Sequence, residues 1–167
     1  SKKEQFYSTA VDSQGIVDRA AKLDLPEVLA LESQYNVDLT GEGAIGDGVS
    51  TVLVDSSELG LYEMSSGGVA IAEGGLEAGD TPFAATLLSD GRKAWGLGKN
   101  EEATAVFETN QRGYAFEVIT VSDRGGRKEQ FYSTAVDSEG IADRADKLDL
   151  SEVLAKEALY NIDLTGE

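Results

Sequence analysis

An internal duplication constrains this chain more than any other feature of its sequence. Residues 2–42 align with residues 127–167 at an offset of 125 (127 − 2), and nine of the 41 aligned positions differ, which leaves 32 identical. Unrelated segments do not agree to this extent. Self-similarity at a fixed period is typical of repeat architectures, in which each unit chiefly contacts its neighbours. We therefore expect part of a tandem array with a period near 125, in preference to a single domain with two similar helical flanks.

Each copy contains the same helix signal. Asp24 is suited to cap a helix over residues 26–35, and Glu27 stands three residues after the cap, as in a capping box. A proline lies in the first turn, and apolar residues follow at helical spacing. The second copy keeps this pattern over residues 149–160. We expect one helix in each copy, and a short helical turn over residues 16–23 in front of the first.

Between the two copies the periodicity changes from helical to alternating. Turn-forming sequences rich in Gly, Asp and Ser separate short segments of β-type composition. The expected strands are 51–55, 59–64, 69–73, 83–88, 93–97, 103–108, 114–121 and 129–136. This pattern predicts an α+β fold that is mainly an antiparallel β domain of about eight short strands. The domain would be a sandwich, a small barrel or a meander, flanked by two similar helical linker segments.

These segments divide the chain into three parts. Residues 1–48 are expected to be a helical linker with a calcium-loop-like turn that ends a preceding repeat. Residues 49–136 form the antiparallel β domain, and residues 137–167 the helical start of the next repeat. If the strand at 129–136 completes the β domain, then residues 4–11 belong to the sheet of a preceding unit. We expect that segment to be frayed or to pair with the edge of a neighbouring molecule, a route to self-association.

Composition excludes several classes of function. Fourteen Lys and Arg against 31 Asp and Glu give a net charge of −17. Such a surface repels phosphate, so no nucleic-acid partner is expected. The absence of Cys and His removes thiolate catalysis, His-based triads and the usual zinc sites. No apolar run approaches the roughly 20 residues that span a bilayer, so no membrane insertion is expected.

The run DLTGEGAIGDG, residues 38–48, fits two incompatible patterns. Its glycines spell GxGxxG, but a dinucleotide site needs a strand before the glycines and a helix after them. Here a predicted helix precedes the glycines and a β region follows, so we reject that interpretation. Framed from Asp38, the same residues resemble a degenerate calcium loop with Gly at the sixth position, where a sharp turn is required.

The calcium interpretation names six candidate ligands. These are Asp38, Thr40 and Glu42 at loop positions one, three and five, the Ala44 carbonyl at seven, and Asp47 or Glu32 in place of the carboxylate missing at twelve. Because few of these ligands are charged, we expect weak calcium affinity, about 10⁻⁴ to 10⁻³ M or poorer. The alternative is a Gly-rich turn held by its own hydrogen bonds. Calcium is the one cofactor that the sequence suggests.

The run LESQYNVDLTGEGAIGDG resembles a motif of large bacterial secreted and surface proteins. In those proteins an LE…F…DLNGDG.IG segment separates repeated β-rich units of roughly this length, which often contain Trp. Thr40 and Glu42 stand where the motif has Asn and Asp. The segments GLYEMSSGGVAIAE, RKAWGL and YAFEVITVSD look like the β portion of such a unit. The resemblance implies an adhesin-like or surface-layer protein, secreted or at the cell surface, with a structural role.

Three classes of function are weighed. The leading hypothesis is a non-catalytic tandem module for structure or adhesion, whose partners are neighbouring repeats of the same chain. The second is a module that binds a carbohydrate or a cell-surface protein through exposed aromatic side chains near Trp95, Tyr62 or Tyr114. An enzyme is not expected, because the sequence shows no paired acids, nucleophile elbow or phosphate loop to which a catalytic role can be assigned.

Overall fold

A computed structural model of the chain describes residues 4–41, 45–56, 58–123 and 129–166. Within these ranges it contains two α-helices and ten strands in three antiparallel sheets, none of which closes into a barrel. The predicted α+β fold with mainly β structure is therefore confirmed. The strands are β1 (Phe6–Ser8), β2 (Ala21–Leu23), β3 (Val49–Asp55), β4 (Leu59–Met64), β5 (Val69–Glu73), β6 (Thr86–Leu87), β7 (Glu101–Glu108), β8 (Phe116–Ser122), β9 (Gln130–Val136) and β10 (Asp146–Lys147). The helices are α1 (Leu25–Tyr35), α2 (Leu150–Tyr160) and the 3-10 turn η1 (Gln111–Gly113).

Both α-helices begin and end as the sequence predicts. The Asp24 carboxylate accepts a hydrogen bond from the Glu27 backbone N–H at 3.1 Å, and the Glu27 carboxylate accepts one from the Asp24 N–H at 2.8 Å. The second copy repeats this capping box at α2. Each helix ends at an asparagine, Asn36 or Asn161, in the left-handed conformation that closes a helix C-terminus. The duplication in sequence is thus a duplication in local structure.

Two of the sheets are four-stranded meanders, in the orders β3-β4-β5-β6 and β10-β9-β8-β7. Most predicted strands form, and those at 59–64 and 69–73 have the predicted bounds. The strand expected at 93–97 is wrong, and that expected at 83–88 is reduced to β6. The reason is a turn between them, in which the Asp90 carboxylate accepts the backbone N–H of Arg92 and of Lys93, both at 2.9 Å. The chain is folded back around Asp90 instead of continuing along the sheet.

Two further predictions concern residues 4–11 and 16–23. Residues 16–23 contain strand β2 instead of the expected helical turn, and β1 pairs with β2 within the same chain, so it is not frayed. Pairing of residues 4–11 with a neighbouring molecule stays a prediction. The Asp12 side chain closes the connection, because its carboxylate accepts the backbone N–H of Gln14 and of Ile16, both at 2.9 Å. The second copy builds the same hairpin from β9 and β10. No strand lies on the other edge of β1 within the described residues.

One hydrophobic core joins the two four-stranded sheets. Its buried residues come from β4 and β5 on one side, from β7, β8 and β9 on the other, and from the segments that follow β6 and β9: Leu61, Val69, Ile71, Leu88, Ala103, Val106, Val118, Val136 and Ala142. A second cluster lies under α2, where Val153 and Leu148 pack with Ala105 and Ile119. Residues 146–166 therefore pack with the sheet that contains β7, β8 and β9.

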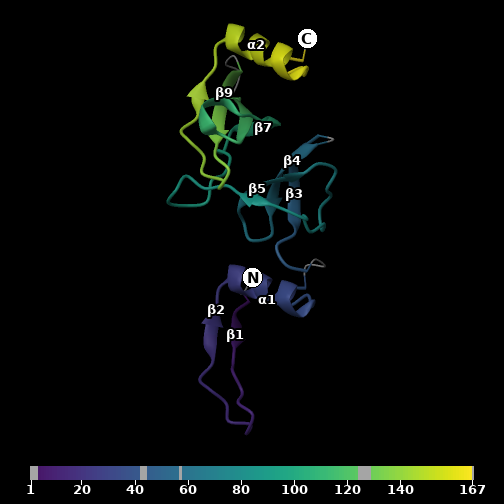
Figure 1. The fold of residues 1–167 in the computed structure, drawn as a ribbon, viewed down its shortest axis with the longest axis vertical. Helices are drawn as coiled ribbons and strands as arrows, with labels where there is room; N and C mark the ends of the chain where they lie inside the picture. Colours follow the sequence, from purple (N-terminus) through teal and green to yellow (C-terminus); the bar gives the residue numbers. More distant parts are fainter. Residues whose placement is uncertain (1–3, 42–44, 57, 124–128, 167) are drawn as a thin grey trace.

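The elements follow one another along the length of the molecule (Figure 1). The β1–β2 hairpin projects at one end, α1 lies between it and the β3–β5 sheet, and the β7–β9 sheet and α2 occupy the opposite end. The two helices with duplicated sequence thus lie on either side of the body formed by the two four-stranded sheets.

Candidate functional site

The connection between α1 and β3 is held together by the carboxylate of Glu32. Glu32 lies in the last turns of α1 and is 0 % exposed. One carboxylate oxygen accepts the backbone N–H of Leu39 and of Thr40, both at 2.8 Å, and the other accepts that of Gly46 at 3.0 Å. A single side chain therefore fixes both ends of the loop that follows the helix. We call residues 32–50 and their contacts the joint.

The ionised form of Glu32 is favoured by these contacts. Burial raises the pKa of the Glu32 carboxyl, but the hydrogen bonds donated by the backbone of Thr40, Gly46 and Leu39 lower it by more, so the pKa lies below its ordinary value. Hydrogen bonds to a charged acceptor are about twice as strong as neutral ones. The buried charge is thus stabilised by the loop that it closes.

The β-sheet side of the joint is fixed by a second carboxylate. The Asp47 side chain accepts the backbone N–H and the hydroxyl of Ser66, each at 2.9 Å. The carbonyl of Gly48 accepts the backbone N–H of Ser65 at 2.9 Å, and the Thr81 hydroxyl donates to the Ile45 carbonyl at 3.1 Å. Glu32 and Asp47 together connect α1 to the turn between β4 and β5 through one short segment.

A glycine is required where the loop meets the helix. Gly46 has φ = +82°, in the left-handed region, and a Cβ built at this position would lie 2.3 Å from the Ser33 Oγ and 3.7 Å from the Leu29 carbonyl oxygen. A side chain at position 46 would therefore strain the backbone and displace the Ser33 hydroxyl. Gly46 entered the sequence analysis only in the rejected GxGxxG pattern, and Gly43, the glycine expected at the sharp turn, lies outside the described residues.

The structure places the six predicted calcium ligands as follows. Glu32 and Asp47 face the N–H and hydroxyl donors described above. One Asp38 oxygen accepts the Gly41 N–H at 2.6 Å and the Thr40 hydroxyl at 3.4 Å, while Glu42 and Ala44 lie outside the described residues.

Among the residues with described positions, no group of three or more Asp or Glu side chains is arranged to hold a metal ion. A cation would compete with the hydrogen-bond donors for the oxygens of Glu32 and Asp47. This geometry favours the alternative of a turn held by its own hydrogen bonds, and calcium binding stays a prediction.

The second copy repeats the loop at the opposite end of the molecule. Glu157, which is equivalent to Glu32, accepts the backbone N–H of Leu164 at 2.7 Å and that of Thr165 at 2.8 Å. Asp163 accepts the N–H of Gly166 at 2.6 Å, as Asp38 does for Gly41. The joint geometry is thus a property of the repeated sequence.

The three aromatic residues proposed for ligand binding do not lie on one surface. Tyr62 is fully buried in the β3–β5 sheet, and its hydroxyl donates to the Glu73 carbonyl at 2.9 Å. Trp95 is half-buried against the core that joins the two sheets. Tyr114 is half-buried, with its hydroxyl on the Asp143 carboxylate. The three side chains therefore do not form an exposed aromatic surface.

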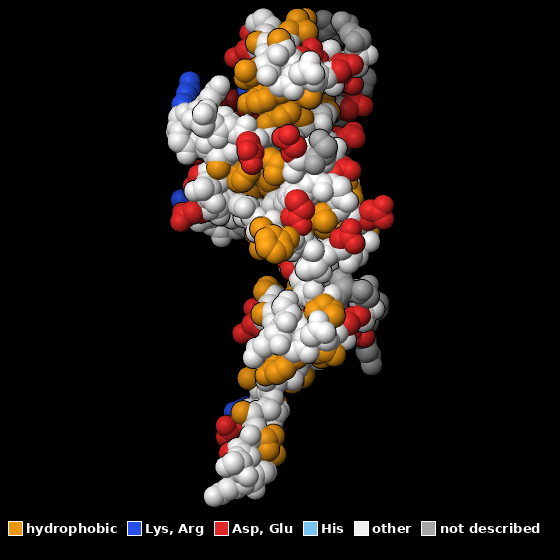
Figure 2. Space-filling view, turned by 45° about the vertical axis from the view of Figure 1, so that its right-hand side comes forward, with side chains coloured by type: hydrophobic (Ala, Val, Ile, Leu, Met, Phe, Trp, Pro, Cys, Tyr) orange, Lys and Arg blue, Asp and Glu red, His pale blue; other side chains and the backbone are white. Residues whose placement is uncertain are grey.

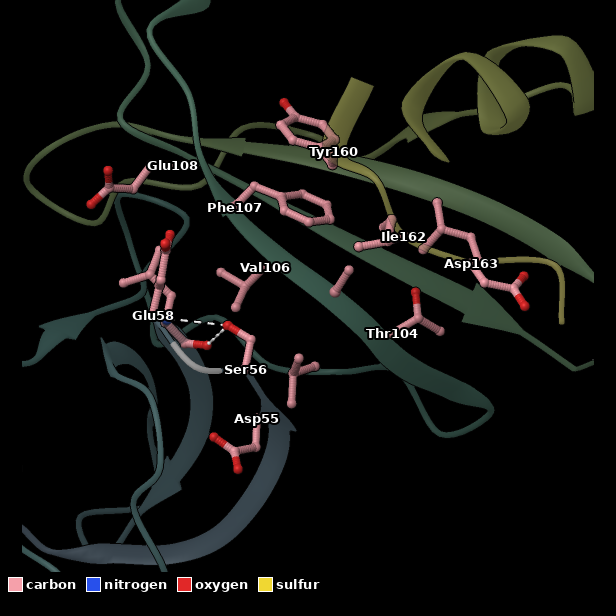
Figure 3. A pocket seen from close by; sticks show the side chains of 14 residues that line it. Asp55, Ser56, Glu58, Thr104, Val106, Phe107, Glu108, Tyr160, Ile162 and Asp163 are labelled. Atoms are coloured by element: carbon pink, nitrogen blue, oxygen red, sulfur yellow. Dashed lines mark hydrogen bonds between the residues drawn. The ribbon is translucent and has the colours of Figure 1, made fainter. Parts of the chain in front are cut away.

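A groove that the sequence did not reveal lies between the two sheets and the end of α2 (Figure 3). It encloses about 630 Å³ and is lined by residues 54–59 (residue 57 excepted), 104–108, 160 and 162–164. Phe107 and Tyr160 stack there with ring centroids 3.9 Å apart. Acidic side chains, including Asp55, Glu58 and Asp163, surround the apolar residues. No local pattern signals this groove, because its three segments are far apart in the sequence.

A buried carboxylate beside the groove connects α2 to its sheet. Glu117 of β8 accepts hydrogen bonds from the Lys156 ammonium group, from the Ser133 hydroxyl at 2.6 Å and from the Tyr160 hydroxyl at 2.9 Å. Burial raises the pKa of Glu117, but the three donors lower it by more, and the pKa lies below its ordinary value. The cluster holds α2 against its sheet, and the Glu117 carboxylate accepts three hydrogen bonds within it.

Comparisons with protein-family models, with curated proteins and with solved structures found no match to this chain. Neither α1 nor α2, the two α-helices in the described part of the chain, has the length and apolar character needed to cross a membrane.

Proposed function

We propose that the chain is a non-catalytic module of a tandem-repeat protein and that its role is mechanical. One observation carries the proposal: the duplicated segment forms the same hairpin, capped helix and carboxylate-closed loop at both ends of the chain. In the first copy this loop leads into a β domain to which it is attached by side-chain hydrogen bonds. The second copy presents the same loop at the far end. Successive units would therefore join through identical connections.

The form of the joint supports a stiff connection. The loop is short, its helix side is fixed by Glu32 and its sheet side by Asp47, and Gly46 is packed against α1. A flexible linker has none of these contacts, because its backbone groups are solvated. The placement of α1 and α2 on either side of the two sheets means that added units extend the molecule along its long direction (Figure 1).

The surface is consistent with a spacer. Acidic side chains are spread over the visible face of the β-sheet body, and basic ones are few (Figure 2). A net charge of −17 makes neighbouring arrays repel one another and keeps them apart in solution. The joint sequence resembles repeats of bacterial secreted and surface proteins. The proposal therefore places the module in an adhesin-like protein outside the cell. The mechanical role does not depend on the weak calcium binding that the loop sequence suggests, because the hydrogen bonds of Glu32 and Asp47 hold the joint.

The alternative of a carbohydrate- or protein-binding module has less support. It depended on aromatic side chains sharing one exposed surface, and Tyr62 is fully buried while Trp95 and Tyr114 are half-buried.

Small-angle X-ray scattering from constructed arrays tests the mechanical proposal. Arrays of one, two and three 125-residue units would be compared in the same buffer. Stiff joints make the maximum dimension grow in proportion to the number of units. Growth close to the square root of that number is expected from a flexible chain and would contradict the proposal.

A further inference from the structure

One strand sequence occurs in two different environments in this chain. Residues 4–13 and residues 129–138 both read EQFYSTAVDS. In the second copy Val136 is 0 % exposed, whereas the equivalent Val11 is 61 % exposed. The same valine is therefore buried in the second copy and exposed in the first.

The two copies differ in the strands that lie beside them: among the described residues, β9 has a neighbour on both edges, and β1 on one. β9 lies between β10 and β8, and its whole length is paired with β8, from Gln130 opposite Ser122 to Val136 opposite Phe116. β1 has β2 in the place of β10, but the edge that corresponds to β8 carries no strand within the described residues. An open edge of this kind presents unpaired N–H and C=O groups and is a template for another strand.

The helix beside β1 has an uncovered face as well. In the second copy Tyr160 stacks on Phe107 of β7, and Ile162 packs in the cluster with Ala105 and Ile119. In the first copy the residue equivalent to Tyr160 is Tyr35, which is 66 % exposed. The edge of β1 and the face of α1 thus lack the two strands that β7 and β8 provide in the second copy.

We propose that this edge and face receive a β7–β8 strand pair from a neighbouring repeat unit of the same chain, and that the strand beside β1 carries a neutral residue where β8 carries Glu117. The inference rests on the proposed function and specifies the partner surface of each joint. The strand pairing follows from the identity of the two strand sequences, because the pairing of β9 with β8 can be transferred to β1 residue by residue.

The neutral residue at the position of Glu117 follows from one of the nine differences between the copies. Lys156, which donates to the buried Glu117, is replaced by Leu31 in the first copy. A glutamate placed beside Leu31 would be buried without its cation, and a buried charge that loses its partner is strongly destabilising. The strand that completes this sheet must therefore differ from β8 at that position.

A two-unit chain tests the proposal. A copy of residues 42–126 that carries Glu117→Leu is placed before residues 2–167, so that its last residue is followed by the residue that aligns with 127. Amide hydrogen exchange is then measured across β1, with the original chain at two concentrations as the control for self-pairing. We expect exchange at residues 5–11 to slow at least tenfold in the two-unit chain. Unchanged exchange overturns the strand-pairing proposal.

Paired variants of the two-unit chain test the identity of the residue beside Leu31. Glu117→Leu in the added unit is expected to raise the melting temperature, whereas the same substitution in the original unit, beside Lys156, is expected to lower it. Leu31→Lys is expected to stabilise the two-unit chain that keeps the added glutamate. Equal loss of stability at both positions overturns the neutral-residue assignment.

Failure of this inference and failure of the proposed function give different results. If β1 stays unprotected while scattering from the same chains shows stiff extension, the strand pairing is wrong and the tandem module stands. If scattering shows units that move independently, the proposed function fails.

Discussion

Lys156 of α2 donates a hydrogen bond to Glu117 of β8, 39 residues earlier in the chain, and so attaches the last helix to the sheet beneath it. Ser133 and Tyr160 donate to the same carboxylate. The corresponding position of the first copy is Leu31, and among the described residues the helix that carries it has no equivalent of β8 to contact. The two copies therefore share a local fold and differ in what they pack against.

Replacing the cation of this pair should destabilise the β7–β10 sheet. We expect Lys156→Met to lower the free energy of unfolding by about 2 kcal/mol, because hydrogen bonds to charged groups contribute roughly 1.5–3 kcal/mol and the carboxylate keeps its other donors. Urea denaturation measures the change. Lys99→Met, at an exposed lysine, is the matched control, and equal effects of the two substitutions would contradict the assigned role.

Acid should remove the contribution of Glu117. The pKa of Glu117 in the folded chain lies below its ordinary value of 4.5. A depressed folded pKa gives stability that is present above pH 4.5 and is lost as the pH falls through the folded pKa. We expect Glu117→Gln to be less stable than the parent at pH 7 and the difference to shrink toward pH 3. A difference that stays constant over this range would show that the charge of Glu117 is not involved.

Neutralising Glu32 should loosen the joint. The amide of Glu32→Gln keeps one acceptor oxygen and turns an NH₂ group toward a backbone N–H, so we expect a loss of about 2 kcal/mol. We also expect a smaller radius of gyration in scattering, because the hairpin and α1 would move away from their extended placement relative to the sheets. Glu63→Gln, at an exposed position of β4, makes the same chemical change away from the joint. The prediction fails if both variants behave like the parent.

Calcium offers a separate test of the joint. The oxygens of Glu32 and Asp47 each accept at least one N–H or hydroxyl donor, so an ion would compete with these donors for them. We expect 10 mM calcium to raise the melting temperature by no more than the same concentration of magnesium, which screens the net charge of −17 equally well. A larger rise with calcium that Asp38→Asn abolishes would place a calcium ion in the loop.

Local signals predicted the elements of this fold, and partners distant in the sequence set the rest. The capping box at Asp24 and the alternation over β4 and β5 are sufficient to place those elements. The expected strand at 93–97 failed because the hydrogen bonds of Asp90 fold the chain into a turn there. β2 was missed because its pairing with β1 is decided by the turn at Asp12, which hydrophobic periodicity does not register.

The sequence predicted the position of the candidate site and left its chemistry open between a calcium loop and a turn held by its own hydrogen bonds. Glu32, Asp38 and Asp47 were singled out as ligands because carboxylates at loop spacing suit a cation. In the structure each accepts hydrogen bonds, and Glu32 does so from residues up to 14 positions away. A carboxylate that binds an ion and one that closes a loop have the same sequence signature. The groove beside Phe107 had no signature, because three distant segments form it.

The most direct test of the account is ¹⁵N relaxation of the 167-residue chain. The rotational correlation times of α1 and of the β4–β5 hairpin, on opposite sides of the joint, would be measured in one sample. A joint fixed by Glu32 and Asp47 predicts one common correlation time, which separates into two in Glu32→Gln. A shorter correlation time for α1 in the parent chain would mean that the two sides move independently, and it would contradict the proposal of a mechanical module.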